Sequence, residues 1–326
     1  MKTALITGGA GYVGSHCCKA FARAGWKVVV FDNLSRGWRD AVRFGPLVEG
    51  DIRDAGAVSA ALAAHKPDVV VHFAAFAYVG ESVTDPAIYY DNNVFGTHVL
   101  LEQLRASACR SILLSSSCAT YGVPDALPID EASPQAPINP YGLSKLMVEQ
   151  MTRDYVAAYG LSAGALRYFN AAGCDAEGEL GERHDPETHL IPLALRAALS
   201  GEPLTVNGED FDTRDGTAER DFIHVTDLAQ AHLLAAERIV GTPGFHTYNL
   251  GTGTGTTILE LLDAVRRITG RTVPVRMGPR RPGDPAALVA SPRKAMGELG
   301  WTPRHSSIDN IVATAAAWEA RAQVFA

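Results

Sequence analysis

Short runs of β-branched and other apolar residues alternate with longer amphipathic stretches over the first two thirds of the chain. The runs that we expect to form strands are Ala4–Thr7, Val28–Phe31, Leu47–Val48, Val69–Phe73, Ile112–Ser115 and Leu166–Tyr168. The stretches with helical periodicity are Tyr12–Ala24, Ala55–Ala64, Ile88–Ala108 and Tyr141–Tyr159. Strands that alternate with helices pair in parallel through crossover connections. The pattern therefore predicts an α/β fold with a doubly wound parallel sheet.

The pattern changes after Asn170. Residues 171–189 are rich in Gly, Asp and Glu and show no clear period, which predicts a mobile surface segment. Apolar helical patterns return at Ile191–Leu199 and Ile258–Ile268. These patterns predict a second, smaller α/β unit in the last part of the chain.

Two short runs in the second half, Asp221–Val225 and Tyr248–Leu250, have strand character and are expected to return to the first unit. We therefore expect residues 1–170 to form the first domain, with return segments near 219–250. Residues 171–326 are expected to form mainly the smaller domain.

The composition excludes several classes of protein. The formal net charge of −7 argues against a general nucleic-acid binder. The five cysteines include no CxxC pair, so we expect a reducing cytoplasm rather than a disulfide framework or a zinc site. No apolar run reaches the length of a signal-peptide core or a membrane span. No histidine–carboxylate cluster with metal-ligand spacing is apparent either, so we expect no metal.

The segment Thr7–Gly14 places glycines at a GxxGxxG spacing, directly after the first strand and before the first helix. A tight turn, a close backbone approach to a pyrophosphate and close helix packing each require a residue without Cβ. The helix N-terminus adds unpaired N–H groups and partial positive charge. The pattern predicts a Rossmann-type dinucleotide site that includes Gly8, Gly11, Tyr12, Val13 and Gly14.

Asp32 ends the second strand, where a carboxylate can accept hydrogen bonds from both ribose hydroxyls. It would repel a 2′-phosphate, so NAD is favoured over NADP, although Arg36 and Arg39 leave NADP open. After the third strand, Asp51 and Ile52 are placed to bracket the adenine. Phe73, Ala74 and Ala75 lie at the end of the fourth strand, and the small residues of this segment leave room for a ring of the cofactor.

Tyr141 and Lys145 stand at i and i+4 on one helical face. A phenol with a pKa of about 10 is a poor base at neutral pH. A neighbouring ammonium and a positive nicotinamide both lower that pKa. Ser117, at the end of the fifth strand, can hydrogen-bond a substrate hydroxyl and relay its proton. The three residues predict acid–base catalysis on a hydroxyl beside a nicotinamide cofactor.

These features resemble those of the UDP-glucose 4-epimerases, a family of the extended short-chain dehydrogenases/reductases. The motifs that carry the resemblance are Gly8–Gly14, Asp32-Asn33, Gly50-Asp51-Ile52, Val79–Ser82, Tyr89–Val94, Ser115–Ser117, Tyr121-Gly122, Tyr141–Lys145, Arg167–Asn170, Asp215–Thr217, Arg220–Val225, Tyr248–Gly251 and Arg280–Asp284. They extend over nearly the whole chain, and those of the second half are specific to nucleotide-sugar epimerases.

The resemblance implies a tightly bound NAD and interconversion of UDP-glucose and UDP-galactose. Tyr141 would take the 4-hydroxyl proton while C4 gives its hydride to the nicotinamide, and the 4-keto sugar would turn and recover the hydride on its other face. The resemblance adds four cofactor-binding residues: Asn33, Asn93, Ser115 and Tyr168. It also implies a homodimer, formed by helices that contain Val94–Leu104 and Leu143–Met151.

The resemblance also implies the substrate-binding residues. Besides Ser117 and Tyr141 they are Asn170, His189, Leu190, Thr205, Asn207, Arg220, Arg281, Asp284 and Leu288. Arg220 and Arg281 would clamp the diphosphate, because a guanidinium binds phosphate in a planar fork. Asp284 would bind the uridine ribose.

Four positions depart from the family pattern. The family has Lys in place of Ala77, an aromatic residue in place of Asn207, Asn in place of His189, and often Tyr or Cys in place of Leu288. Since Leu288 stands where sugar size is limited, epimerisation of UDP-N-acetylglucosamine, or of UDP-xylose and UDP-arabinose, remains an alternative.

Three other functions share part of these features. A sugar 4,6-dehydratase has Asp-Glu where this chain has Cys118-Ala119, and a decarboxylase also needs a Glu near this point. An inactive NAD sensor would be expected to lack Tyr141 or Lys145. We interpret Cys118 as a buried structural thiol, and His16 and His72 as packed polar residues.

Overall fold

The computed structural model describes residues 1–281 and 283–322, so Pro282 of the Arg280–Asp284 motif and residues 323–326 lie outside the described part. Seven parallel strands form the central sheet, in the order β11-β6-β5-β4-β1-β2-β3. They are β1 (Thr3–Thr7), β2 (Lys27–Asp32), β3 (Leu47–Glu49), β4 (Val69–His72), β5 (Ser111–Ser117), β6 (Ser162–Tyr168) and β11 (Gly244–Leu250). The predicted doubly wound sheet is confirmed.

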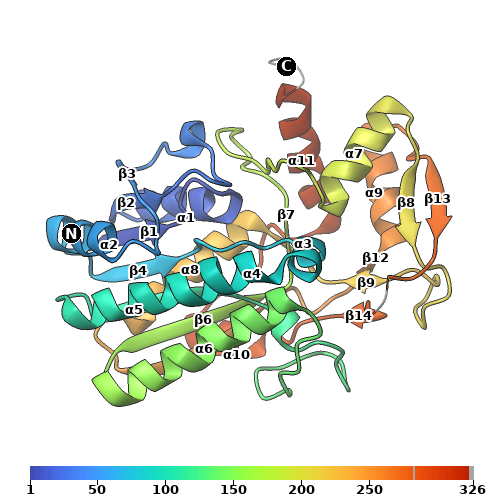
Figure 1. Ribbon diagram of the computed structural model, residues 1–326. Coiled ribbons are helices and arrows are strands. Elements are labelled where there is room, and N and C mark those ends of the chain that lie inside the picture. The colour runs from blue at the N-terminus through green and yellow to red at the C-terminus, as the bar shows by residue number, and fades with distance from the viewer. Residues whose placement is uncertain (282, 323–326) are drawn as a thin grey trace.

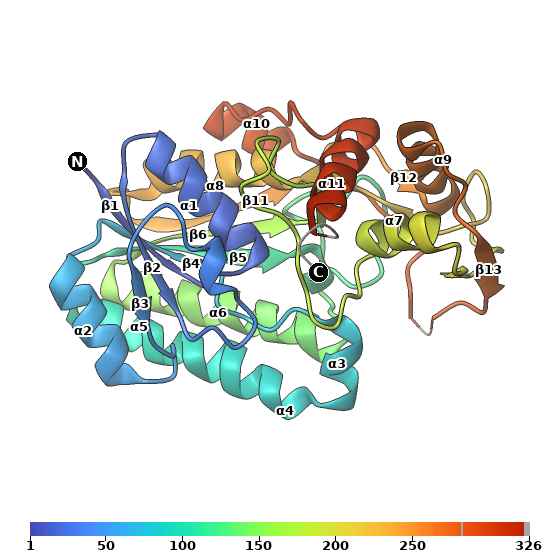
Figure 2. The same ribbon diagram turned by 90° about the horizontal axis from the view of Figure 1, so that it is seen from above.

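Helices cover both faces of the sheet (Figures 1 and 2). One face carries α1 (Tyr12–Arg23), α8 (Val225–Ile239) and α10 (Arg293–Leu299), and the other carries α2 (Ala55–His65), α5 (Gly96–Ala106) and α6 (Pro140–Tyr159). Each layer encloses a separate apolar core, so the strands are buried on both sides and their sequences are apolar throughout.

The stretch predicted as one helix over Ile88–Ala108 consists of three consecutive parts. They are α4 (Pro86–Tyr89), a π-helical stretch η2 (Tyr90–Phe95) and α5, and they follow the short α3 (Val79–Thr84). The wider π-helical turn does not interrupt the apolar period, so the sequence does not reveal it. Two 3₁₀ turns also occur, η1 (Arg39–Ala41) and η3 (Cys118–Thr120).

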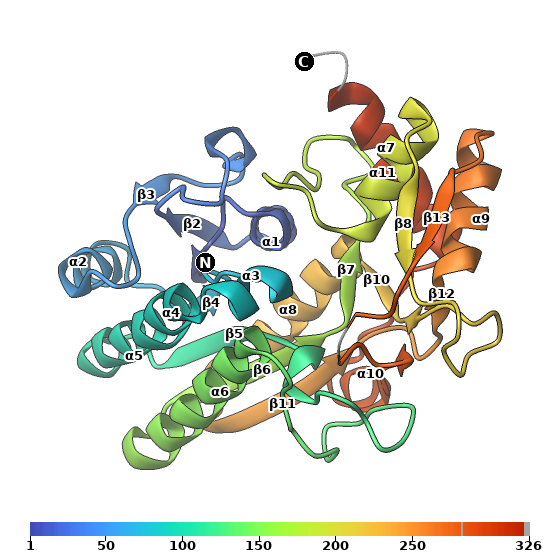
Figure 3. The same cartoon turned by 45° about the vertical axis from the view of Figure 1, so that its right-hand side comes forward.

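The remaining elements lie beyond the carboxyl ends of the central strands (Figure 3). Their strands form three small sheets, made of β7 (Asn170–Ala172) with β10 (Phe222–His224), β9 (Glu219–Arg220) with β12 (Thr256–Thr257) and β14 (Ala287–Leu288), and β8 (Leu204–Asn207) with β13 (Val275–Gly278). The helices α7 (Leu190–Ser200), α9 (Ile258–Thr269) and α11 (Ile308–Ala322) enclose a third core.

The two expected return strands behave differently. Tyr248–Leu250 joins the central sheet within β11, as predicted. Asp221–Val225 does not join it, because β6 is already paired with β5 and β11, and β10 pairs with β7 instead. Among the described residues, no helix has the length and apolar character required to cross a membrane.

Candidate active site

A cleft opens where the strand order reverses, between β1 and β4. The loops after these two strands diverge there, and their residues meet those that follow β2 and β3. The lining consists of Gly8, Gly11, Phe31, Asp32, Asn33, Ser35, Arg36, Gly37, Gly50, Ile52, Phe73, Ala74, Ala75, Phe76 and Asn92. The position and the small residues match the predicted dinucleotide site. Sequence reasoning missed the rim residues Ser35, Gly37 and Phe76, since they lack a motif.

The glycine loop leaves no space for side chains. A Cβ on Gly8 would lie 2.5 Å from the Ala74 backbone nitrogen, and one on Gly14 would lie 2.2 Å from the Gly8 carbonyl oxygen. Gly11 caps α1 without a side-chain hydrogen bond. The first backbone N–H groups of α1, including those of Tyr12 and Val13, can therefore bind a phosphate at the helix N-terminus.

Asp32 is fixed at the edge of this cleft. Its carboxylate accepts hydrogen bonds from the backbone N–H groups of Ala10 (3.0 Å) and Leu34 (2.8 Å), while burial raises its pKa. The two arginines that left NADP open are each paired with a carboxylate, Arg36 with Glu81 at 2.6 Å and Arg39 with Glu49. The site thus presents an acceptor to a ribose and offers no unpaired guanidinium from these two residues to a 2′-phosphate.

Asp51 and Ile52 separate in the structure. Ile52 lines the cleft, whereas the Asp51 carboxylate accepts hydrogen bonds from Asn33 Nδ2 (2.9 Å) and Arg53 Nη2 (2.7 Å). The hydrogen bonds from Arg53 hold the pKa of Asp51 well below its usual range. Asp51 therefore orders the loop around Asn33 and Ile52.

The three expected catalytic residues converge at the carboxyl end of β5. Lys145 Nζ donates to the Ser115 carbonyl oxygen at 2.8 Å and lies 5.9 Å from the centre of the Tyr141 ring. Burial raises the pKa of Tyr141 to about 12, although a hydrogen bond with Ser117 lowers it. Burial also lowers the pKa of Lys145 to about 8. Without a ligand, the site thus disfavours both the phenolate and the ammonium.

Two further predicted residues support this centre. Tyr168 Oη lies 2.7 Å from Ser115 Oγ on the neighbouring strand. The π-helical stretch turns Asn93 inward, where Nδ2 donates to Ser144 Oγ at 3.1 Å and to the Phe76 carbonyl at 3.0 Å. Asn93 thereby connects the catalytic helix α6 to the cofactor cleft.

A buried ion pair behind the catalytic helix was not predicted. Arg167 and Glu149 are each 1% exposed, and Arg167 Nη2 donates to Glu149 Oε2 at 2.6 Å. Ser116 donates to the same carboxylate, and Arg167 Nη1 donates to Tyr121 Oη. These bonds connect α6 to β5 and β6, so they fix the helix that carries Tyr141 and Lys145.

Four of the residues expected to bind the UDP-sugar form two pairs in the structure. Arg220 forms an ion pair with Asp284 and donates to the carbonyl oxygens of Glu219 (2.8 Å) and Pro285 (3.0 Å). With its amide oxygen turned toward Arg281, Asn207 accepts from Nε and Nη2 of Arg281 at 3.2 Å. Arg220 is therefore held against Asp284 before any diphosphate binds.

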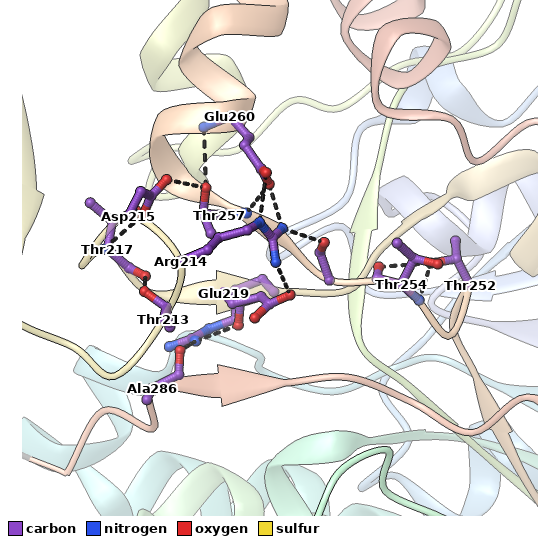
Figure 4. A network of polar contacts seen from close by, with 12 residues as sticks. Thr213, Arg214, Asp215, Thr217, Glu219, Thr252, Thr254, Thr257, Glu260 and Ala286 are labelled. Carbon is purple, nitrogen blue, oxygen red and sulfur yellow. Dashed lines mark hydrogen bonds and ion pairs between the residues drawn. The ribbon is translucent and has the colours of Figure 1, made fainter.

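A polar network fixes the strands that carry these residues (Figure 4). Arg214 donates to Glu260 at the start of α9 (2.6 Å) and to Glu219 on β9 (2.7 Å). The neighbouring Asp215 accepts hydrogen bonds from Thr217 and Thr257. This network connects β9 to α9 and includes Glu219, which precedes Arg220, so we interpret it as the support of Arg220 rather than as a reaction centre.

The other predicted substrate residues surround the same region. Asn170 begins β7, and its N–H donates to the Asp221 carbonyl at 3.0 Å. Leu190 begins α7, and Thr205 is exposed on β8, on the same face as Asn207. Leu288 pairs with Arg220 across β14 and β9 and packs near Cys118, next to Ser117.

His189 is bound in a cluster that the sequence analysis missed. The expectation that no histidine–carboxylate cluster has metal-ligand spacing is wrong, because Glu182, His184, Glu187 and His189 converge within 4.8 Å. Burial opposes protonation of His189, but contacts with Glu182 and Glu187 raise its pKa to about 10. The segment 171–189 packs against the first domain, since Lys19 of α1 binds Asp175 within it at 2.7 Å.

Three side chains that could be mistaken for reactive groups are packed. Burial raises the pKa of the Cys118 thiol to about 12 and lowers the pKa of His16 to about 4 and that of His72 to about 3. The His72 ring nitrogens lie 2.7 and 2.9 Å from the hydroxyls of Thr7 and Thr97. A thiol and imidazoles held neutral in this way fit structural roles.

Comparison with known proteins agrees with this geometry. Residues 4–251 match the family described as NAD dependent epimerase/dehydratase family. The chain is 50% identical over 321 residues to a UDP-glucose 4-epimerase of Rhizobium leguminosarum bv. trifolii, with 98% of each chain covered.

Two solved structures share the whole fold. A UDP-glucose 4-epimerase from Brucella ovis in complex with NAD is 53% identical with a TM-score of 0.95, covering 97% of this chain and 98% of its own. A UDP-glucose-4-epimerase from Stenotrophomonas maltophila, with bound NAD and formylated UDP-arabinopyranose, is 36% identical with a TM-score of 0.97, and each chain is fully covered. With its dinucleotide cleft and its Ser117–Tyr141–Lys145 centre, the chain belongs to the NAD dependent epimerase/dehydratase family and, within it, to the UDP-glucose 4-epimerases.

Proposed function

We propose that the protein interconverts UDP-glucose and UDP-galactose by inverting C4 with tightly bound NAD. The observation that carries this proposal is the meeting of Ser117, Tyr141 and Lys145 beside the dinucleotide cleft. A hydroxyl that enters this point meets a phenol, a serine hydroxyl and a buried ammonium.

Tyr141 takes the 4-hydroxyl proton and later returns it, and Ser117 holds the same hydroxyl in place. NAD, when bound by Gly8, Gly11, Gly14 and Asp32, supplies the acceptor and donor of the C4 hydride. The Lys145 ammonium, 5.9 Å from the centre of the Tyr141 ring, favours the phenolate and so acts against the effect of burial.

Inversion requires a firm hold on the nucleotide and a loose hold on the sugar. The α7 N-terminus at Leu190, together with Arg220 and Arg281, supplies donors for the diphosphate. Asp284 binds the ribose once the diphosphate shares the Arg220 guanidinium. Leu288 presents an apolar surface to the sugar, which can therefore turn without breaking hydrogen bonds at that position.

Elimination of water is not favoured. A 4,6-dehydratase needs an acid and a base beside the serine strand end, where this chain has Cys118-Ala119. The Cys118 thiol stays protonated at neutral pH, because burial raises its pKa to about 12. A pentose substrate is the second candidate, since a similar structure holds a UDP-arabinopyranose derivative.

We also propose a homodimer and a cytoplasmic location. Apolar side chains on the outer side of α6 and of the π-helical stretch are exposed, namely Phe95 (49%), Leu143 (38%) and Met147 (37%). A second copy can cover this face through a helix bundle. All five cysteines are free and buried, as expected in a reducing compartment.

The test of the function compares Tyr141→Phe with Tyr155→Phe, which removes a phenol on the same helix outside the site. Tyr141→Phe should lower turnover of UDP-glucose by about two to four orders of magnitude. UDP affinity, measured by calorimetry, should change little in either variant. Near-normal turnover in Tyr141→Phe would show that another residue moves the proton.

A further inference from the structure

The segment between β7 and α7 contains two groups of acidic residues, and among the described residues only one of them surrounds a lysine. Asp175, Glu177 and Glu179 surround Lys19 Nζ at 2.7, 3.0 and 2.8 Å. Their negative charge is therefore compensated within the chain.

The second group, Glu182, His184, Glu187 and His189, is compensated differently. Among the described residues, no lysine or arginine lies within ion-pair distance of its two carboxylates. The Glu182 and Glu187 side chains are only 4% and 2% exposed. Two buried carboxylates require a compensating cation, which here is either protonated His189 or a bound metal ion.

Hydrogen bonds satisfy only part of these carboxylates, since Glu187 Oε1 accepts from the backbone N–H groups of Thr188 and His189, each at 2.9 Å. Glu182 Oε1 and Glu187 Oε2 are buried and have no hydrogen-bond partner among the described residues. His189 Nδ1 approaches Glu182 Oε1 to 2.9 Å, but not in the direction of a hydrogen bond. The two Nδ1 atoms of His184 and His189 lie only 3.2 Å apart. The four side chains thus point toward a common centre rather than toward one another.

The separations of these atoms are close to those between ligands of one metal ion. The two histidine Nδ1 atoms lie 2.9 and 3.5 Å from Glu182 Oε1; His189 Nδ1 lies 3.3 Å from Glu187 Oε1, and His184 Nδ1 lies 3.6 Å from Glu187 Oε2. Four ligands at about 2.0–2.1 Å from a zinc ion lie about 3.3–3.4 Å from each other. Imidazole and carboxylate are ordinary ligands of zinc and related divalent transition metals.

We propose that Glu182, His184, Glu187 and His189 bind one divalent transition-metal ion of the zinc class in a closed, structural site. The ion neutralises the two buried carboxylates and connects the ends of the segment 182–189. Four protein ligands leave no position for a substrate, so the ion does not take part in epimerisation.

The surroundings indicate what the ion would stabilise. The His184 ring lies between those of Tyr12, at 6.1 Å, and Tyr78, at 5.9 Å, which belong to the start of α1 and to the loop after β4. Trp318, which belongs to α11, donates a hydrogen bond from Nε1 to the Glu182 carbonyl oxygen at 3.0 Å. Since His189 directly precedes α7, the ion fixes the helix N-terminus to which we assign the substrate diphosphate.

The test uses untagged, NAD-loaded protein produced with added zinc and dialysed against metal-free buffer. Elemental analysis should find about one zinc per chain in the wild type and in the matched control His65→Gln, and less than about a tenth in Glu182→Gln/His184→Gln. Bound NAD and the circular dichroism spectrum establish whether the double variant is folded. A folded double variant that retains as much zinc as the wild type overturns the proposal.

Two measurements on the wild type keep the proposal testable if the double variant does not fold. Replacement of zinc by cobalt(II) should give the intense visible absorption of tetrahedral cobalt, and a chelator should lower the melting temperature of the wild type. A wild-type protein that retains no zinc, and binds none in competition with a chromogenic chelator, overturns the proposal.

Discussion

The replacement of Lys145 by Met tests how the buried phenol becomes a base. In the ligand-free site burial raises the pKa of Tyr141 to about 12, so that almost no phenolate is present at neutral pH. The Lys145 ammonium is the protein's own charge that opposes this effect. Lys145→Met removes the charge and retains much of the side-chain volume.

The distance sets the expected magnitude. Lys145 Nζ lies 5.9 Å from the centre of the Tyr141 ring. At an effective dielectric constant of about 20, two unit charges at this separation interact by roughly 3 kcal/mol, or about 2 pKa units. Loss of the ammonium should therefore raise the pKa of Tyr141 by about 2 units and reduce the phenolate population at neutral pH about 100-fold.

The pH dependence of the activity follows from the titration of both Tyr141 and Lys145. Burial lowers the pKa of Lys145 to about 8, so the ammonium is present below that pH and disappears above it. In the ligand-free protein these two pKa values place the coexistence of phenolate and ammonium between about pH 8 and pH 12, and the positive nicotinamide of bound NAD would lower the pKa of Tyr141 toward neutral pH. In Lys145→Met, the acidic limb of kcat/KM for UDP-glucose should move about 2 units toward alkaline pH, with about 100-fold lower activity at pH 7.

The assay is the pH profile of kcat/KM for NAD-loaded wild type, Lys145→Met and the control Lys27→Met. Lys27 is exposed at the start of β2, at the opposite end of the strand from Asp32, so its replacement should leave the profile unchanged. If Lys145→Met loses activity but keeps its acidic limb at the wild-type pH, Lys145 acts by holding the cofactor, and the electrostatic argument is refuted.

Two further predictions concern specificity and stability. Leu288→Ser should improve turnover of UDP-N-acetylglucosamine relative to UDP-glucose, and Leu288→Tyr should reduce it. Each change should be tenfold to roughly a few hundredfold, because one or two tight contacts contribute about 1–3 kcal/mol. A wild type that converts both sugars equally well would show that Leu288 does not limit sugar size. Arg167→Met should lower the free energy of unfolding by about 3–5 kcal/mol in urea titration, because it leaves Glu149 buried and unpaired, and Glu149→Leu/Arg167→Met should recover part of the loss. A loss no larger in Arg167→Met than in the double variant would contradict this explanation.

The sequence predicted the central sheet because its strands are buried on both faces and are apolar throughout, as in β4 with Val69, Val70 and Val71. It did not predict the pairing of β10 with β7, because a strand of three residues carries no information about its neighbour. The π-helical stretch at Tyr90–Phe95 was also missed, since one widened turn preserves the apolar pattern.

The candidate site was predictable where its residues form short local motifs. The glycine loop with Asp32, and Tyr141 with Lys145, are of this kind. The Arg167–Glu149 and Arg220–Asp284 pairs were beyond sequence reasoning, because they join residues 18 and 64 positions apart on different elements. The Glu182–His189 cluster is local, but in a loop without fixed periodicity its spacing does not show that the side chains converge.

The most direct test of the central claim is the fate of the hydrogen on C4. Purified protein is incubated, without added NAD, with UDP-glucose that carries deuterium at C4, and the products are resolved by NMR. We expect UDP-galactose with the deuterium still on C4, because the bound NAD takes the hydride and returns it to the same sugar. Product that has lost the deuterium, or a protein that converts UDP-xylose but not UDP-glucose, would contradict the proposed function.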